Sequence, residues 1–185
     1  MNGKSLLTIA TAAALLTVLG ATALSAQDKY TVQVPNGLAF SEFRGYESWQ
    51  VISISENGGV VAAIMGNPAM IQAYQSGAPG NGKPFPDGAK MAKVHWKPTK
   101  KETYPGQPTV PATQLNVDFM AKDSKRFADG GGWGYGAFDY DPATDTFKPS
   151  DETATPPQGH DAKCGVACHT VVKARDYVFT DYAHR

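Results

Sequence analysis

Several short apolar stretches, separated by turn and loop residues, run through the middle of the chain and are typical of β-strands. Glu56-Asn57-Gly58 is a turn signal of the Asn-Gly kind, which predicts a hairpin between the first two of these stretches. The predicted strands cover residues 50–55, 59–65, 89–97, 115–122 and 135–140, with a last one at 177–182.

A helix is predicted after the second strand. Asn67 suits the N-cap and Pro68 the first helical position, and the helix should run through Tyr74 and end at Gly77. Loops rich in Gly, Pro, Lys or other polar residues are expected at residues 78–88, 97–111 and 141–159. Together these elements predict an α+β fold that is mainly antiparallel β-sheet with a few helices, one of them a short helix near the C-terminus that carries Cys164 and Cys168.

The N-terminal segment has the order of features of an export signal. Lys4 supplies a positive charge, residues 6–19 are uncharged and mostly apolar, and small residues follow. We expect a signal peptide over 1–26, with cleavage after Ala26, although cleavage after Ala23 fits the small-x-small rule better. The apolar run is short for a membrane span of about twenty residues; an uncleaved anchor is the alternative.

Residues 27–185 are then expected to form one domain in the periplasm. Removing the signal removes one lysine and no acid, which leaves 16 basic and 17 acidic residues. This balance gives no reason to expect a nucleic-acid partner or an anionic membrane surface. We see no further segment that would span a membrane. Export would also place both cysteines in an oxidising compartment.

The most informative segment is Cys164-Gly165-Val166-Ala167-Cys168-His169. The usual signature for c-type haem has two residues between the cysteines and a His directly after the second. The thiols add to the two vinyl groups along one edge of the haem, and the imidazole binds the iron. Residues four apart share a helix face, as residues three apart do, so the wider gap still presents both sulfurs together. We therefore expect one haem c, attached through Cys164 and Cys168, with His169 as the iron ligand.

Other uses of the two cysteines stay open. A disulfide is disfavoured in a helix, because Cβ atoms four residues apart lie roughly 5–6 Å from each other and a disulfide needs ~3.8 Å; a loop would remove that objection. A structural zinc site normally needs four ligands, and no further cysteine exists to complete one. Two unmodified thiols are the third alternative. His160 is expected in a loop, and His184 is expected to be exposed to solvent.

A family resemblance rests on landmarks spread over most of the mature chain. They are Tyr46-x-x-Trp49, Asp87-Gly88-x-x-x-x-Lys93, Lys122-Asp123-Ser124-Lys125-Arg126-Phe127, Trp133, the haem motif, and Asp176-Tyr177-Val178-Phe179-Thr180. In this order and spacing, residues 43–182 resemble the cytochrome P-460 and cytochrome c′-beta group.

The resemblance implies a small, periplasmic, mainly β, homodimeric cytochrome whose haem has His on one side and an open or weakly occupied distal side. In the P-460 branch a lysine is covalently bonded to a porphyrin carbon, and the enzyme oxidises hydroxylamine. A soluble acceptor would take the electrons. The c′-beta branch lacks the bond and binds gases such as nitric oxide.

Two pocket residues follow from the resemblance. The cross-linking lysine matches Lys93, and strand parity puts it on the same face as Met91 and His95. The bond requires a neutral amine, which burial favours; a solvated strand lysine is the alternative. The pocket carboxylate, a glutamate in that branch, falls at Asp118, where it can take protons from hydroxylamine, unless the side chain faces outward. A pocket arginine of that branch falls at Ala62.

Three functions stay open. Hydroxylamine oxidation ranks first because Lys93 and Asp118 are both present. A gas-binding cytochrome without turnover is the alternative, because Asp118 is one methylene shorter than glutamate and the arginine is missing. A plain electron carrier would need a second axial ligand, for which the candidates are Met65, Met70, Met91, Met120 and His95, although methionine on apolar segments is more often core filler.

Overall fold

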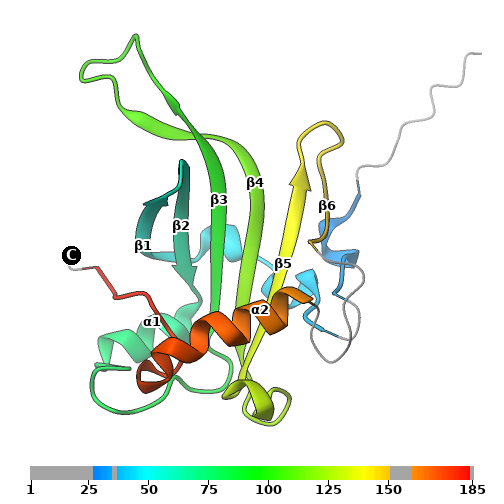
Figure 1. Ribbon diagram of the computed structural model, residues 1–185, viewed down its shortest axis with the longest axis vertical. Coiled ribbons are helices and arrows are strands. Elements are labelled where there is room, and N and C mark those ends of the chain that lie inside the picture. Colours follow the sequence, from blue (N-terminus) through cyan, green and yellow to red (C-terminus); the bar gives the residue numbers. More distant parts are fainter. Residues whose placement is uncertain (1–26, 35–36, 151–159, 184–185) are drawn as a thin grey trace, which may run out of the picture.

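The fold is built on a six-stranded antiparallel sheet in which each strand pairs with its neighbours in sequence (Figure 1). The computed structural model describes residues 27–34, 37–150 and 160–183, without the side chains of 160–164; the expected signal at 1–26 lies outside the described residues. The strands are β1 (Gln50–Asn57), β2 (Val60–Gly66), β3 (Lys90–Lys100), β4 (Thr109–Lys122), β5 (Trp133–Asp141) and β6 (Thr146–Pro149). The expected α+β class dominated by antiparallel sheet is confirmed.

Short helices accompany the sheet, and within the described ranges none is long and apolar enough to cross a membrane. The α-helices are α1 (Pro68–Gln75) and α2 (His160–His169). The 3-10 segments are η1 (Lys29–Thr31), η2 (Phe40–Phe43), η3 (Tyr46–Ser48), η4 (Ala128–Gly130) and η5 (Thr170–Arg175).

The predicted start of α1 is confirmed. The Asn67 side chain accepts a hydrogen bond from the Met70 N–H, and Pro68 is the first helical residue. The same Asn67 oxygen accepts from the Lys90 N–H, so the cap also joins α1 to the start of β3. The helix ends at Gln75, and Gly77 follows with φ +93°.

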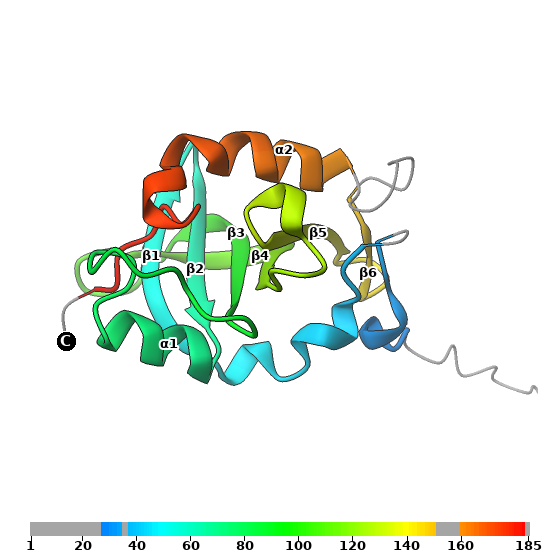
Figure 2. The same ribbon diagram turned by 90° about the horizontal axis from the view of Figure 1, so that it is seen from below.

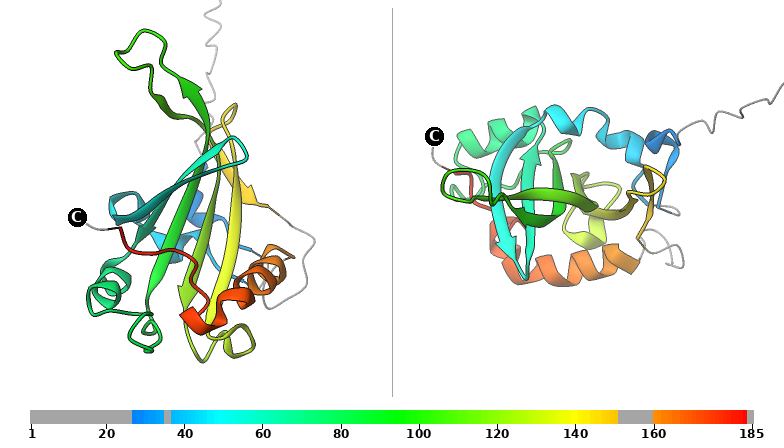
Figure 3. Two further views of the ribbon diagram at one scale, coloured as in Figure 1. Left: turned by 60° about the vertical axis from the view of Figure 1, so that its left-hand side comes forward. Right: turned by 90° about the horizontal axis from the view of Figure 1, so that it is seen from above.

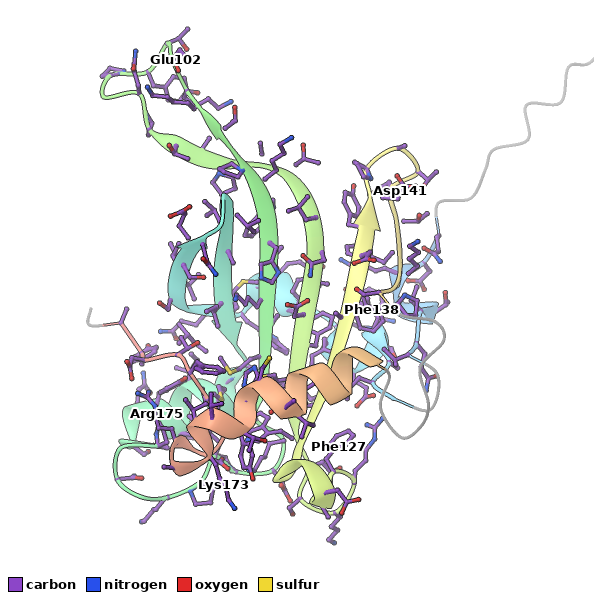
Figure 4. The ribbon with its side chains drawn as sticks, viewed as in Figure 1. Glu102, Phe127, Phe138, Asp141, Lys173 and Arg175 are labelled. Atoms are coloured by element: carbon purple, nitrogen blue, oxygen red, sulfur yellow. The ribbon has the colours of Figure 1, made fainter. Side chains whose placement is uncertain are left out.

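The loop expected over residues 97–111 is shorter than predicted. β3 continues to Lys100 and β4 begins at Thr109, and these two residues pair at the end of a long hairpin arm. Pro98 and Pro111 face each other in this arm. Proline has no backbone N–H to donate to a neighbouring strand, and this loss is tolerated where no strand pairs on that side. Figure 3 shows the arm projecting beyond the sheet, and Figure 4 labels Glu102 at its tip.

Two other predictions at the C-terminal side are wrong. The polar linker expected from residue 141 contains β6, in which Phe147 is buried and pairs with Tyr140. The last strand expected over residues 177–182 does not form. Asp176 and Tyr177 both have positive φ, 49° and 64°, so the chain turns sharply at the point where the strand was expected to begin.

The two faces of the sheet are covered by different parts of the chain, as Figure 2 shows. The N-terminal segment with η1, η2 and η3 lies against one face, and α2 crosses the other. The first face is closed by an aromatic core that includes Phe40, Phe43, Phe119, Phe138 and Phe147. The second face is closed at one end by a separate core that includes Met70, Phe85, Trp133, Tyr135 and Val178. Between that second face and α2 lies a cavity.

Candidate haem site

The cavity has a volume of about 550 Å³, which lies within the range of cofactor pockets. Its floor is formed by β3, β4 and β5, and its other walls by α2 and the C-terminal segment. The lining side chains that bear on its chemistry are Met91, Lys93, Asp118, Met120, Tyr135, Cys168, His169 and Phe179. The structure therefore brings Lys93, Asp118, Cys168 and His169 to one cavity, although Lys93 and His169 are 76 positions apart in the sequence.

The register of the sheet explains why Lys93 and Asp118 meet. Lys93 pairs with Asp118 across β3 and β4, and Asp118 pairs with Ala137 across β4 and β5. Side chains alternate between faces along a strand, so alternate residues of β3, β4 and β5 share the cavity floor. The intervening residues of the same strands, such as Val94 and Val117, are buried in the aromatic core.

His169 is oriented by a main-chain hydrogen bond. Its Nδ1 lies 2.6 Å from the carbonyl oxygen of Tyr177. A carbonyl only accepts, so Nδ1 carries the hydrogen and the lone pair of the neutral ring is on Nε2. Burial lowers the pKa of His169, an effect that the Tyr177 hydrogen bond partly opposes and Lys93 adds to. The site thus favours the neutral imidazole, the form that binds a metal.

Aromatic rings hold the imidazole on two sides. The Tyr135 ring lies 5.0 Å from the His169 ring, and the Phe179 ring lies 4.9 Å away in an edge-on arrangement. Phe179 remains 48% exposed and lines the cavity. These rings restrict the rotation of His169, and they leave an apolar surface at the cavity wall.

The cysteine motif lies on α2, as predicted. Cys168 is a free, exposed thiol that lines the cavity directly before His169. Cys164 is four residues earlier on the same helix, and its side chain is outside the described part of the chain. Helical Cβ atoms at this spacing are roughly 5–6 Å apart, too far for a disulfide.

Gly165, between the two cysteines, fixes how closely α2 approaches the sheet. A Cβ atom at this position would lie 2.7 Å from Cγ of Tyr135. Real Cβ contacts are longer than this, so any other residue would push the helix away from β5. The glycine therefore sets the height of the cavity.

The two charged side chains on the cavity floor, Lys93 and Asp118, differ in their contacts. Asn116 donates a hydrogen bond of 2.7 Å to Oδ1 of Asp118. Lys93 is half-buried and makes no hydrogen bond or ion pair with any residue that the structure describes. Although Lys93 and Asp118 face each other across the strands, their charged groups do not pair. The lysine amine is therefore available to a group bound in the cavity.

His95 shares the cavity face but does not line the cavity. Its Nδ1 lies 3.7 Å from Oδ2 of Asp118, beyond hydrogen-bonding distance. Burial, and next the positive charge of Lys93, lower the pKa of His95 to about 4. The nearby carboxylate would favour the charged form, but it is 43% exposed and screened by water. His95 is thus neutral at pH 7.

The candidate second axial ligands separate into two groups. Met91 and Met120 line the cavity. Met65 is buried in the aromatic core on the opposite face, and Met70, a residue of α1, is buried in the second core. Neither of these two lines the cavity, so both are excluded by position.

Sequence reasoning missed the residues that orient His169. No role was assigned to the carbonyl of Tyr177 or to the rings of Tyr135 and Phe179. Tyr177 and Phe179 belong to a run that carries the family resemblance, which was the available signal. A main-chain acceptor leaves no trace in residue type, so its partner is visible only in the fold.

The residues present fit a haem. The cavity is large enough for a cofactor, it is lined by apolar and aromatic groups, and it has an imidazole whose Nε2 is available beside an exposed thiol. Comparison with known proteins agrees with this. The model of the cytochrome P460 family matches residues 43–180, and no curated protein matches the chain. Since this match covers most of the sequence, the chain belongs to the cytochrome P460 family and is a haem cytochrome.

Proposed function

We propose that this chain carries one haem c, bonded to Cys164 and Cys168 and ligated by His169, and that it oxidises hydroxylamine in the periplasm. The observation that supports this most is that Lys93 and Asp118 line the same cavity as Cys168 and His169. The homodimer and the soluble electron acceptor implied by the family resemblance belong to the same proposal, as does export through residues 1–26.

Each residue has a defined task in this proposal. The bound haem supplies an iron that accepts electrons. His169 binds it through Nε2, held in place by the Tyr177 carbonyl. The Asp118 carboxylate, which lines the cavity, accepts protons as hydroxylamine loses electrons. Lys93 contributes the amine that the P-460 branch bonds to its porphyrin, and the lack of a competing partner among the described residues supports that role.

Intact mass followed by tryptic mapping tests the cross-link. The haem peptide is expected to contain Cys164, Cys168 and the fragment with Lys93, and the reduced protein should have a strongly red-shifted Soret band. Lys93→Met should return the spectrum of an ordinary c haem and abolish hydroxylamine oxidation. Lys97→Met, an exposed lysine on the same strand, is the matched control and should behave as the wild type. A wild-type haem peptide without the Lys93 fragment would remove the main support for the enzyme.

A gas-binding cytochrome of the c′-beta kind is the second candidate. It is favoured by Ala62, which stands at the arginine position of the P-460 branch and is buried beside its cross-strand neighbour His95. A small apolar residue at this point supplies no charge to a substrate. An ordinary c-haem spectrum, tight nitric oxide binding and no hydroxylamine oxidation would select this function.

A further inference from the structure

The turn that follows η5 is held by a buried ion pair. The side chains of Lys122, at the end of β4, and Asp176, directly after η5, are 7% and 12% exposed. Lys122 Nζ donates to Oδ1 of Asp176 at 2.6 Å and to the carbonyl of Gly131 at 3.0 Å. Burying two charges is costly unless their hydrogen bonds are well satisfied, so this pair constrains the turn strongly.

Asp176 is also held through its other polar groups. Its Oδ2 accepts from the main-chain N–H of Phe85 at 2.8 Å, and its carbonyl accepts from the indole Nε1 of Trp133 at 2.8 Å. These partners come from β4, β5 and the loop before β3. The side chain and carbonyl of Asp176 are therefore held by the sheet and the loop before β3, while its N–H donates to the Lys173 carbonyl of η5. Figure 4 labels Lys173 and Arg175, which mark the end of η5 directly before this turn.

The backbone at the turn is in an unfavourable conformation. Asp176 and the next residue, Tyr177, have φ values of 49° and 64°, and non-glycine residues rarely adopt this region. Gly131 makes room for the turn, because a Cβ atom there would lie 2.1 Å from the Tyr177 ring. Such a conformation persists only where the surroundings enforce it, and the bonds to Asp176 do so.

The carbonyl of Tyr177 is the acceptor for Nδ1 of His169. We propose that the Lys122–Asp176 pair is a positioning device for the iron ligand: it holds the turn so that this carbonyl keeps its hydrogen bond to His169. The inference rests on the proposed ligation of iron by His169. When the ring nitrogen that does not bind the metal donates a hydrogen bond, the imidazole becomes a stronger electron donor to the metal and lowers its reduction potential. The Lys122–Asp176 pair would therefore strengthen the bond between the iron and His169 and favour the ferric state.

Two substitutions with opposite changes of charge test the proposal in the holoprotein. Asp176→Asn keeps one acceptor oxygen and suits a positive φ, while Lys122→Met keeps most of the side-chain stem. Both should shift the iron–histidine stretching band of the ferrous protein to lower frequency and the reduction potential to more positive values. An effect of charge alone would move the potential in opposite directions in the two variants, and that result would overturn the proposal.

Further variants separate positioning from stability. Trp133→Phe removes one hydrogen bond to the Asp176 carbonyl without removing a charge, and it should shift the same band by a smaller amount. Asp181→Asn is the matched control: its carboxylate is exposed and pairs with Arg175, and it should leave band and potential unchanged. Thermal unfolding is measured on all variants. If Asp176→Asn or Trp133→Phe lowers the unfolding temperature but leaves the stretching band at its wild-type frequency, the pair is structural only.

The wild-type protein separates this inference from the proposed function. A ferrous wild type without an iron–histidine band, or a His169→Ala variant with a wild-type spectrum, would contradict ligation by His169. A wild-type band that is unaffected in Asp176→Asn, Lys122→Met and Trp133→Phe would contradict only the positioning role.

Discussion

The two faces of the sheet use the same strands for opposite purposes. On β4, Val117 and Phe119 are buried in the aromatic core, while Asp118 between them lines the cavity. The aromatic face is filled by rings in contact, such as Phe43 stacked on Phe119 with centroids 4.0 Å apart. The cavity face carries a lysine that has no partner within the described part of the chain, a histidine with a lowered pKa and a space of about 550 Å³.

This difference indicates how stability and chemistry are divided in the fold. Filled apolar packing supplies most of the free energy of folding. Unpaired or buried polar groups cost free energy, and here they gather on one face, where a bound group can use them. Substitutions on the two faces should therefore affect different measurements.

Phe40→Ala is expected to have the largest effect on stability. The Phe40 ring is fully buried and contacts the rings of five neighbours, Tyr30, Tyr46, Phe119, Phe138 and Phe147. Truncating a buried phenylalanine costs about 3–5 kcal/mol of the free energy of unfolding, which denaturant titration measures. The absorption spectrum of the folded fraction should stay that of the wild type.

Ile54→Ala is the control for this loss, because Ile54 is 69% exposed and should change the free energy of unfolding by no more than about 0.5 kcal/mol. If the folded fraction of Phe40→Ala had an altered absorption spectrum, the aromatic face would affect the cavity face, and the two faces would not be independent.

The pH dependence of stability should reveal His95 on the cavity face. Its pKa is about 4 in the folded protein and 6.5 in a model peptide, so between these values the unfolded chain binds a proton that the folded chain does not. The free energy of unfolding is therefore highest above pH 6.5 and falls as pH drops toward 4. After allowance for partial contact with water, the expected loss is about 1–3 kcal/mol.

His95→Gln isolates this contribution, because other groups titrate equally in both proteins. The difference in stability between wild type and variant should change over the window from pH 6.5 to 4 and be constant above it. A difference that is constant over the whole range would show that His95 is not held neutral by the fold.

Lys93→Met is expected to have the smallest effect on stability. Lys93 has no bonding partner among the described residues, so its replacement should change the free energy of unfolding by about 0.5 kcal/mol or less. Denaturant titration of the haem-free protein measures this without the cross-link. The pKa of His95 should rise in the variant, since Lys93 is one of the causes that lower it. A loss as large as that of Phe40→Ala would make Lys93 a structural residue.

Local signals in the sequence were enough to predict much of this arrangement. The Asn67-Pro68 pair defined the start of α1, because the cap depends on neighbouring residues only. Strand parity put Lys93 on the same face as Met91 and His95, and the structure has this arrangement. The cysteine motif was expected on a short helix near the C-terminus, and α2 carries it.

Features that depend on distant partners were not predictable in this way. β6 forms around Phe147, whose pairing with Tyr140 outweighs the polar residues around it. The expected strand after Asp176 is prevented by bonds that Asp176 makes with Lys122 and Trp133, 54 and 43 residues away in the sequence. Tertiary contacts of this kind override local propensity.

The contact between Gly165 and Tyr135 has a consequence for the unusual three-residue gap between the cysteines. Each residue turns an α-helix by about 100°. Deleting one residue to restore the common two-residue gap would rotate one end of α2 relative to the other. Either the glycine would leave the tyrosine ring or the imidazole would turn away from its carbonyl acceptor. The long gap and the seating of the helix on β5 are thus coupled, and converting this protein to the shorter motif would require rebuilding β5 as well.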